Sequence, residues 1–178
     1  MIAVFLADGF EEIEALATVD ILRRAGLSVS TVGVATQNPT GAHNMQIKAD
    51  VFETELELNA VKAVVLPGGM PGTLNLENSP VVQEAIRIAM TNNSPIGAIC
   101  AAPSILGHAG YLKGKKATCY PGFEGELTGA LCVENVVTDG NITTGCGPGV
   151  AIDFALELVR VLVSAEKADE IRRGMQCR

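Results

Sequence analysis

Short apolar runs rich in β-branched residues alternate with helical stretches along most of this chain. The expected strands are Ile2–Ala7, Leu27–Val34, Val61–Leu66, Ile96–Ile99 and Lys116–Cys119. The expected helices are Glu11–Ala25, Val81–Thr91, Ala101–Ala109, Val150–Val163 and Lys167–Arg173. This repeated β-α-β order predicts an α/β fold, with a mostly parallel sheet and helices packed against both of its faces.

One pair of short runs breaks the parallel pattern. Val136–Thr138 and Ile142–Thr144 flank the dipeptide Asp139-Gly140, which is a strong signal for a tight turn. We therefore expect a small β-hairpin late in the chain. Gln46–Val51 has alternating character and is expected to form only a short excursion.

Length and composition predict a single domain, residues 1–178. The chain has no internal repeat, linker or low-complexity tract, and it is long enough to build a full core. Trp is absent and aromatic residues make up only 4% of the chain, so the core must be largely aliphatic.

Charge and hydropathy exclude several classes of partner. Acidic residues outnumber basic ones 20 to 13, for a net charge of -7, and Lys and Arg form no cluster. Such a surface repels phosphate backbones, so we expect no nucleic-acid partner. No uncharged apolar run reaches the roughly 18 residues of a membrane span, so we expect no membrane partner.

The cysteines indicate a reducing compartment. There are 5 of them, with no C-x-x-C spacing, so no metal site is expected. The first residues, Met1–Gly9, lack the basic start of a signal peptide and fit a buried strand better. Reduced thiols in a cytoplasmic protein are the simplest interpretation.

Cys100 stands where an expected strand passes directly into an expected helix. Ile96–Ile99 precedes it and Ala101 follows, with no loop between them. A side chain on such a turn has a strained backbone and is presented at the carboxyl edge of the sheet, where α/β folds bind ligands. The adjacent helix N-terminus favours negative charge, so we expect the thiol pKa to lie below that of a free cysteine.

The segment after the first strand carries Glu11, Glu12 and Glu14. Acidic residues in a first helical turn are ordinary partners of the helix dipole. Glu14 differs because apolar residues flank it on both sides. A buried Glu14 would keep its proton and could donate it to a thiolate.

Paired glycines, Gly68 and Gly69, follow the third strand. They allow a close backbone approach and a positive φ, and their amides could bind an oxyanion. An ordinary strand-to-helix turn is the alternative interpretation. The segment matches neither a P-loop nor a dinucleotide-binding motif.

His43 and His108 are the two histidines of the chain. A cysteine hydrolase needs an imidazole beside its thiol. His108 lies about two helical turns from Cys100, and His43 lies in a polar loop, so neither is an obvious base. Tyr120 follows a short strand and could offer its hydroxyl or simply pack there. This pattern argues against an ordinary Cys-His protease.

Five motifs occur in order along almost the whole chain. They are Gly9–Glu14, Val19–Gly26, Val64–Gly69, Ala98–Pro103 and Gly147–Ala155. With these motifs at these spacings, the chain resembles the ThiJ/PfpI superfamily, in the branch of the parkinsonism-associated deglycase and chaperone DJ-one. The resemblance implies a flavodoxin-like three-layer sandwich that usually forms a homodimer.

The resemblance also implies site residues. Cys100 matches the reactive cysteine, Glu14 the protonated glutamate that lowers its pKa, and Gly69 the glycine whose amide faces the sulfur. Two positions depart from the pattern: Tyr120 stands where close relatives carry a histidine, and Ala101 stands where peptidase relatives carry one. The second departure argues against proteolysis, and the first removes the usual proton shuttle.

Superfamily members are described as cofactor-free glyoxalases, deglycases, oxidative-stress sensors or chaperones. We expect Cys100 to attack a small aldehyde or glycated substrate without a cofactor. Amides near Gly69 and Ala101 would hold the oxyanion, while Tyr120 and His43 would contact the substrate. The resemblance implies a basic residue in the loop after the second strand, and His43 or a neighbour takes that place here. The alternative is a redox-sensing stress-response protein or chaperone whose cysteine oxidises to sulfinate. A third interpretation is an inert scaffold.

Overall fold

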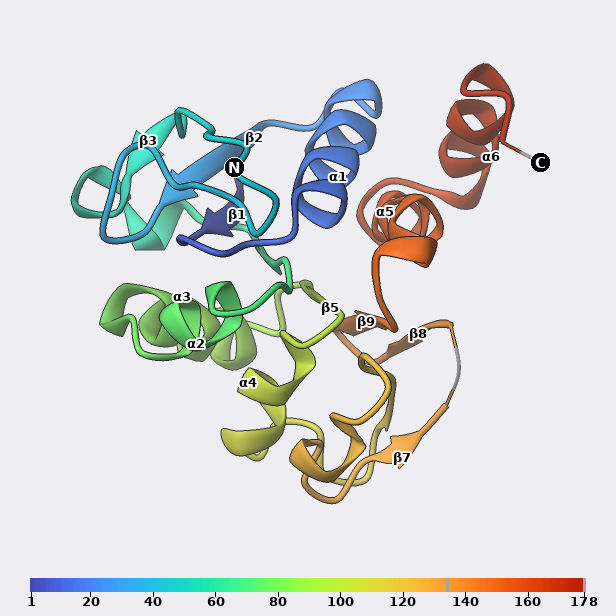
Figure 1. Ribbon diagram of the computed structural model, residues 1–178. Helices are drawn as coiled ribbons and strands as arrows, with labels where there is room; N and C mark the ends of the chain where they lie inside the picture. Colours follow the sequence, from blue (N-terminus) through green and yellow to red (C-terminus); the bar gives the residue numbers. More distant parts are fainter. Residues whose placement is uncertain (134, 178) are drawn as a thin grey trace.

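A sheet of seven strands forms the middle layer of the protein. Its strands are β1 (Ile2–Leu6), β2 (Val29–Gly33), β3 (Val51–Phe52), β4 (Ala63–Leu66), β5 (Ile96–Ile99), β8 (Val136–Asp139) and β9 (Ile142–Gly145). In the computed structural model, which describes residues 1–133 and 135–177, they lie in the order β3-β2-β1-β4-β5-β9-β8 (Figure 1). Neighbouring strands run parallel except for β8 and β9, which are antiparallel.

Helices cover both faces of this sheet. They are α1 (Glu12–Arg24), α2 (Gly72–Glu77), α3 (Pro80–Thr91), α4 (Pro103–His108), α5 (Ala151–Leu162) and α6 (Ala165–Gly174). Short 3-10 turns lie at Glu53–Glu55, Leu58–Ala60, Glu124–Glu126 and Pro148–Val150. The helices α1, α5 and α6 lie on one side of the sheet, and α2, α3 and α4 lie on the other (Figure 1).

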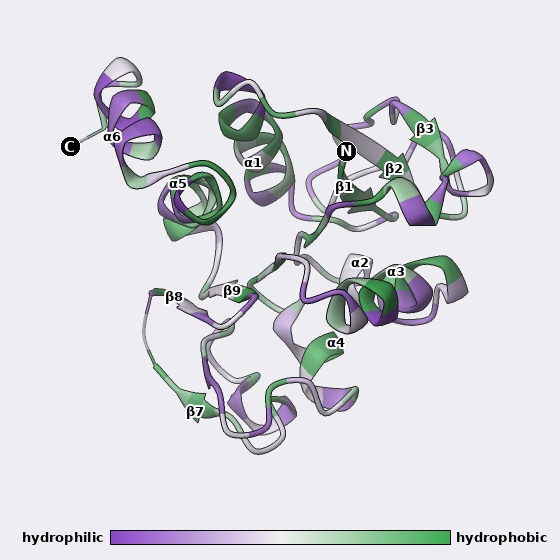
Figure 2. Ribbon diagram, turned by 180° about the vertical axis from the view of Figure 1, so that it is seen from behind, coloured by the Kyte–Doolittle hydropathy of each residue, from purple (hydrophilic) through white to green (hydrophobic). Residues whose placement is uncertain are grey.

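Alternation along the strands builds one apolar core on each face. On β1, Phe5 belongs to the core under α2, α3 and α4, whereas Val4 belongs to the core under α1 and α5. Val64 and Val65 on β4 divide in the same way. Each such side chain stabilises the fold by about 1.5–3 kcal/mol when it leaves water. Figure 2 shows hydrophobic residues along the strands, while α6 at the edge is mostly hydrophilic.

The predicted flavodoxin-like α/β fold is confirmed by this topology. The hairpin at Asp139-Gly140 is also confirmed, since β8 and β9 meet there. The strand expected at Lys116–Cys119 is wrong in extent and in place. It is the shorter β6 (Lys116–Ala117), which pairs with β7 (Leu131–Cys132) in a separate two-stranded sheet.

Two further segments differ from expectation. Helix α2 was not expected, because its segment follows a run of Gly and Pro and has no clear helical periodicity. Gln46–Val51 contributes only Val51 to β3, at the edge of the sheet. In the part of the chain that the structure describes, no helix has both the length and the hydropathy needed to cross a membrane.

Candidate active site

Cys100 occupies a left-handed backbone conformation immediately after β5. Its φ is +63°, which is strained for a residue with a side chain. Hydrogen bonds hold this conformation: the Cys100 amide donates to the Gly145 carbonyl at 2.9 Å, and the Tyr120 amide donates to the Cys100 carbonyl at 2.7 Å. The helix expected at Ala101 begins instead at Pro103, because a tight turn separates it from β5. The strained elbow is therefore present, with a short turn in place of a direct junction.

Glu14 lies in the first turns of α1 with only 1% of its surface exposed. Its Oε2 accepts a 2.8 Å hydrogen bond from the Gly68 amide. Its Oε1 is buried and has no hydrogen-bond partner among the described residues. Burial raises the pKa of Glu14 to about 7, because the interior disfavours the carboxylate. An O–H on Oε1 is thus compatible with near-neutral pH.

The Glu14 carboxyl and the Cys100 thiol interact, and each alters the pKa of the other. Burial and the negative charge of Glu14 raise the pKa of Cys100 to about 12, against the lowering effect of the Gly69 and Ala101 amides. The expected low thiol pKa is therefore wrong in direction. Because the two groups interact, they titrate as one unit, and the first proton leaves this unit near pH 7.

The backbone of the two glycines after β4 packs against Glu14 and Cys100. Gly69 has a φ of +88°, which favours glycine, and its amide faces the Cys100 sulfur. A Cβ on Gly68 would lie 2.6 Å from the Cys100 Cβ and 2.9 Å from Glu14 Oε2. Gly68 was not predicted as a site residue, although the paired glycines after a buried strand marked its position.

A pocket of about 480 Å³ opens above Cys100. Its lining residues are Glu11, Ile13, His43, Gly69, Met70, Cys100, Ala101, Tyr120, Phe123 and Pro148. Cys100 is 9% exposed, so its sulfur lies at the floor with Glu14 beneath it. The structure brings all six predicted site residues to this place, and their roles remain predictions.

Tyr120 and His43 lie in the walls of this pocket. Tyr120 is 46% exposed, and its amide is fixed to the Cys100 carbonyl. His43 comes from the loop between β2 and β3, where buried Glu12 accepts a 2.7 Å bond from its amide and lies 2.8 Å from its Nδ1. This bond to Glu12 raises the pKa of His43. The contact between Glu12 and His43 was not predicted.

One group among the described residues has potential metal-ligand atoms that are close enough together for a metal ion. These atoms lie within 4.8 Å of one another and belong to Glu11, Glu12 and His43. Nδ1 of His43 and both oxygens of Glu12 already take part in hydrogen bonds. We therefore describe this group as a hydrogen-bonded cluster.

The remaining histidine and cysteines lie outside the Cys100 pocket. His108 is bound between Glu77 and Glu126, at 2.6 Å and 2.8 Å, which raises its pKa and holds it away from Cys100. Among the other free thiols, one is buried, one is exposed and two are partly exposed: Cys119, Cys132, Cys146 and Cys177.

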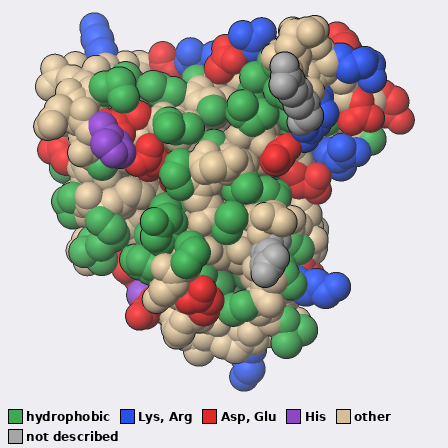
Figure 3. Space-filling view, turned by 45° about the vertical axis from the view of Figure 1, so that its right-hand side comes forward, with side chains coloured by type: hydrophobic (Ala, Val, Ile, Leu, Met, Phe, Trp, Pro, Cys, Tyr) green, Lys and Arg blue, Asp and Glu red, His purple; other side chains and the backbone are tan. Residues whose placement is uncertain are grey.

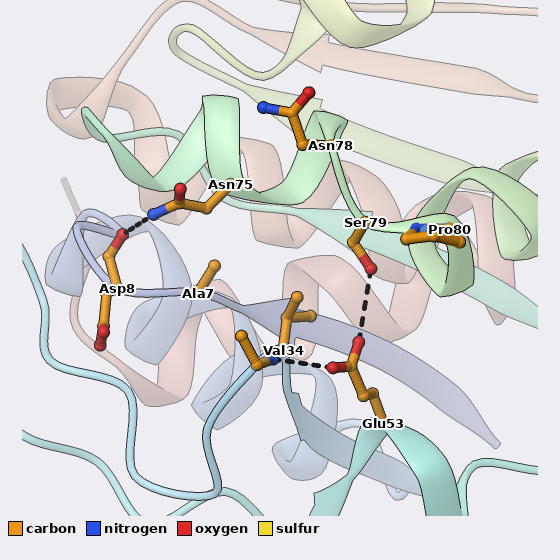
Figure 4. Close-up of a pocket in the computed structure, with 9 residues that line it drawn as sticks. Ala7, Asp8, Val34, Glu53, Asn75, Asn78, Ser79 and Pro80 are labelled. Carbon is orange, nitrogen blue, oxygen red and sulfur yellow. Dashed lines mark hydrogen bonds between the residues drawn. The ribbon is translucent and has the colours of Figure 1, made fainter.

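A second pocket, of about 420 Å³, lies at the carboxyl ends of β1 and β2 (Figure 4). Its polar groups are bonded to one another. Asn75 donates to the Asp8 carbonyl at 2.8 Å, and Ser79 donates to Glu53 at 3.4 Å. It contains no thiol or imidazole, so the Cys100 pocket is the better candidate for chemistry.

Comparisons with known proteins show the family to which the chain belongs. The DJ-1/PfpI family model matches residues 1–161. Protein dj-1beta of Drosophila melanogaster is 35% identical over 97% of this chain and 94% of its own length. Glutathione-independent glyoxalase DJR-1.2 of Caenorhabditis elegans is 32% identical over 93% of this chain and 89% of its own length. Protein DJ-1 homolog B of Arabidopsis thaliana is 35% identical, and the chain spans 40% of that longer protein.

Solved structures share the fold over nearly the whole chain. The crystal structure of Drosophila melanogaster DJ-1beta superposes with a TM-score of 0.93 at 34% identity, covering 99% of this chain and 97% of that one. Oxidized Toxoplasma gondii DJ-1 gives a TM-score of 0.94 at 33% identity, covering 98% and 97%. The chain therefore belongs to the DJ-1/PfpI family.

Proposed function

We propose that this protein is a cofactor-independent enzyme that converts small reactive carbonyl compounds through Cys100, with methylglyoxal or a glycated group as substrate. The observation that carries this proposal is the buried Oε1 of Glu14, which has no partner among the described residues and lies beneath the pocket. A proton on this oxygen would donate to the sulfur and favour the thiolate. The similarity to a protein named as a glutathione-independent glyoxalase supports the same chemistry.

The reaction would start with attack of the Cys100 sulfur on the aldehyde carbon. A C–S bond forms, the carbonyl π electrons move to oxygen, and the amides near Gly69 and Ala101 stabilise the oxyanion. Glu14 gives its proton to the neighbouring ketone oxygen, and its carboxylate then removes the proton from C1 of the adduct and returns it to C2, which gives a lactoyl thioester. Water hydrolyses the thioester, so that methylglyoxal plus one water becomes lactate and the thiol is restored.

The test is methylglyoxal consumption and lactate formation without glutathione. Cys100→Ser and Glu14→Gln should each reduce turnover by at least about 10²-fold. Cys132→Ser, which removes an exposed thiol outside the pocket, is the matched control and should keep wild-type turnover. Wild-type turnover in Cys100→Ser would contradict the mechanism.

A redox role is the second candidate. The pocket leaves Cys100 open to peroxide, and Glu14 could donate a hydrogen bond to a sulfinate. The similarity to an oxidized DJ-1 structure supports this candidate. Mild peroxide would then add two oxygen atoms at Cys100 alone, as measured by intact-mass and peptide mass spectrometry. Equal oxidation of all the cysteines would count against it.

A second copy of this chain is the expected macromolecular partner. Ile13 and Met70 are exposed large hydrophobic residues that line the pocket, and Met45 and Leu74 are also exposed. Figure 3 shows hydrophobic side chains gathered over the middle of one face, with charged side chains around them. Multi-angle light scattering would test the homodimer. We also propose that the protein is located in the cytoplasm.

A further inference from the structure

We propose that His43 and Glu12 form an acid–base dyad, in which His43 is the proton-transfer group of the Cys100 pocket and Glu12 positions it. This inference rests on the proposed carbonyl chemistry. It adds the imidazole that the chain lacks at position 120, where Tyr120 stands. The proposal assigns proton transfer to His43, which comes from the loop between β2 and β3.

The position of His43 is built around the Glu12 carboxylate. Glu12 is only 1% exposed, and its Oε1 accepts hydrogen bonds from the amides of His43 and Met45 at 2.7 Å and 3.5 Å. Gly41 lies so close that a Cβ there would overlap the Glu12 carboxyl. The loop is therefore fixed on α1 by a buried carboxylate, which sets where His43 can reach.

The same carboxylate selects the reactive nitrogen of the imidazole. Glu12 Oε2 lies 2.8 Å from Nδ1 of His43, and because a carboxylate can only accept, Nδ1 carries a proton and donates a hydrogen bond to it. Nε2 has no hydrogen-bond partner among the described residues, and the side chain lines the pocket that contains Cys100. A carboxylate that orients an imidazole and leaves its other nitrogen free is the arrangement of a catalytic dyad.

Charge around His43 favours its protonated form. Glu12 and Glu11 face the ring, with Glu11 Oε2 at 3.5 Å from Nδ1. No Lys or Arg lines the pocket, and its other titratable groups are Cys100 and Tyr120. The hydrogen bond to Glu12 raises the pKa of His43, so the imidazolium persists to higher pH than that of a free histidine.

His43 loses one proton and regains one proton in each turnover. Protonated His43 gives its Nε2 proton to the carbonyl oxygen as the C–S bond forms. The neutral imidazole later takes a proton from the water that attacks the thioester, and this restores the imidazolium. Glu14 keeps the separate task of protonating the ketone oxygen and moving the proton from C1 to C2, and it recovers its own proton from the C1 hydroxyl as the thioester carbonyl forms.

The experiment compares the two histidines of the chain. His43→Ala should lower kcat for methylglyoxal by about 10²-fold with little change in KM, and added imidazole should restore part of the loss. His43→Gln can still bond Glu12 but cannot carry a proton, so it should be as inactive as His43→Ala. His108→Ala, the matched control on α4, should retain wild-type kcat.

The position of the dyad predicts a second readout. Glu12→Gln should shift the basic limb of the pH–kcat profile to lower pH, because the carboxylate that stabilises the imidazolium, the proton donor of the reaction, is removed. Iodoacetamide labelling of Cys100 should be unchanged in His43→Ala, which shows that the pocket remains folded.

The outcomes separate the two proposals. An active wild type together with a fully active His43→Ala overturns the dyad alone. A wild type without carbonyl turnover overturns the proposed function and the dyad with it. Turnover that is abolished by EDTA and restored by a divalent cation would also overturn the dyad, since the Glu11, Glu12 and His43 cluster would then be serving a metal.

Discussion

The Gly68 amide donates a 2.8 Å hydrogen bond to one oxygen of the Glu14 carboxyl, and no described residue bonds the other oxygen. The two oxygens of the Glu14 carboxyl therefore have different surroundings. Oε2 is anchored to the loop after β4, which fixes the carboxyl in place. In the proposed mechanism, Oε1 holds or releases the proton beneath Cys100.

The raised pKa of Glu14 predicts a pH-dependent stability. In the unfolded chain the carboxyl ionises near its ordinary pKa of 4.5, whereas in the folded protein its pKa is about 7. Between these values the folded state binds more protons, so stability falls as pH rises from 4.5 to 7, by about 3 kcal/mol. Glu14→Gln should lose this part of the dependence in urea unfolding at pH 5 and pH 8. An unchanged dependence would show that Glu14 ionises normally.

The coupling of Glu14 and Cys100 predicts how alkylation varies with pH. Because the pair releases its first proton near pH 7, iodoacetamide labelling of Cys100 should rise through that pH to a plateau. In Glu14→Gln the buried thiol titrates alone, and labelling should rise only well above pH 8, since burial disfavours the thiolate. Peptide mass spectrometry measures both curves. Equal midpoints in the two proteins would show that the carboxyl does not assist the thiol.

Gly68→Ala should displace both Cys100 and Glu14, because the new Cβ would lie close to each of them. Its new Cβ would lie 2.6 Å from the Cys100 Cβ, and such overpacking costs about 1–3 kcal/mol. We expect a lower melting temperature and slower labelling of Cys100. Gly125→Ala is the control, because a Cβ there meets nothing within 4 Å. Similar behaviour of the two variants would contradict the close approach of the β4 loop.

The sequence predicted the parts of this protein that depend on local pattern. Alternating strands and helices, the hairpin at Asp139-Gly140 and the elbow at Cys100 all follow from neighbouring residues. Glu14 was found because apolar residues flank it. Helix α2 was missed because its segment carries turn residues and little periodicity.

The parts that could not be predicted depend on tertiary contacts. The pKa of Cys100 is raised by burial, which a helix N-terminus argument does not include. Glu12 looked like an ordinary acidic residue of a first helical turn, and its bond to His43 spans 31 positions in sequence. Only the fold places the loop after β2 over the start of α1.

The shared pocket predicts that an imidazole at position 120 can replace the one at position 43. Tyr120 and His43 both line the pocket above Cys100, and Tyr120 is 46% exposed, so its substitution should be tolerated. In a His43→Ala background, Tyr120→His should recover about tenfold of the lost turnover, because an imidazole again reaches the substrate oxygen. Tyr120→Phe in the same background is the control and should recover nothing. Recovery with Phe as well would mean that the gain comes from packing, and that proton transfer at this wall of the pocket does not limit the reaction.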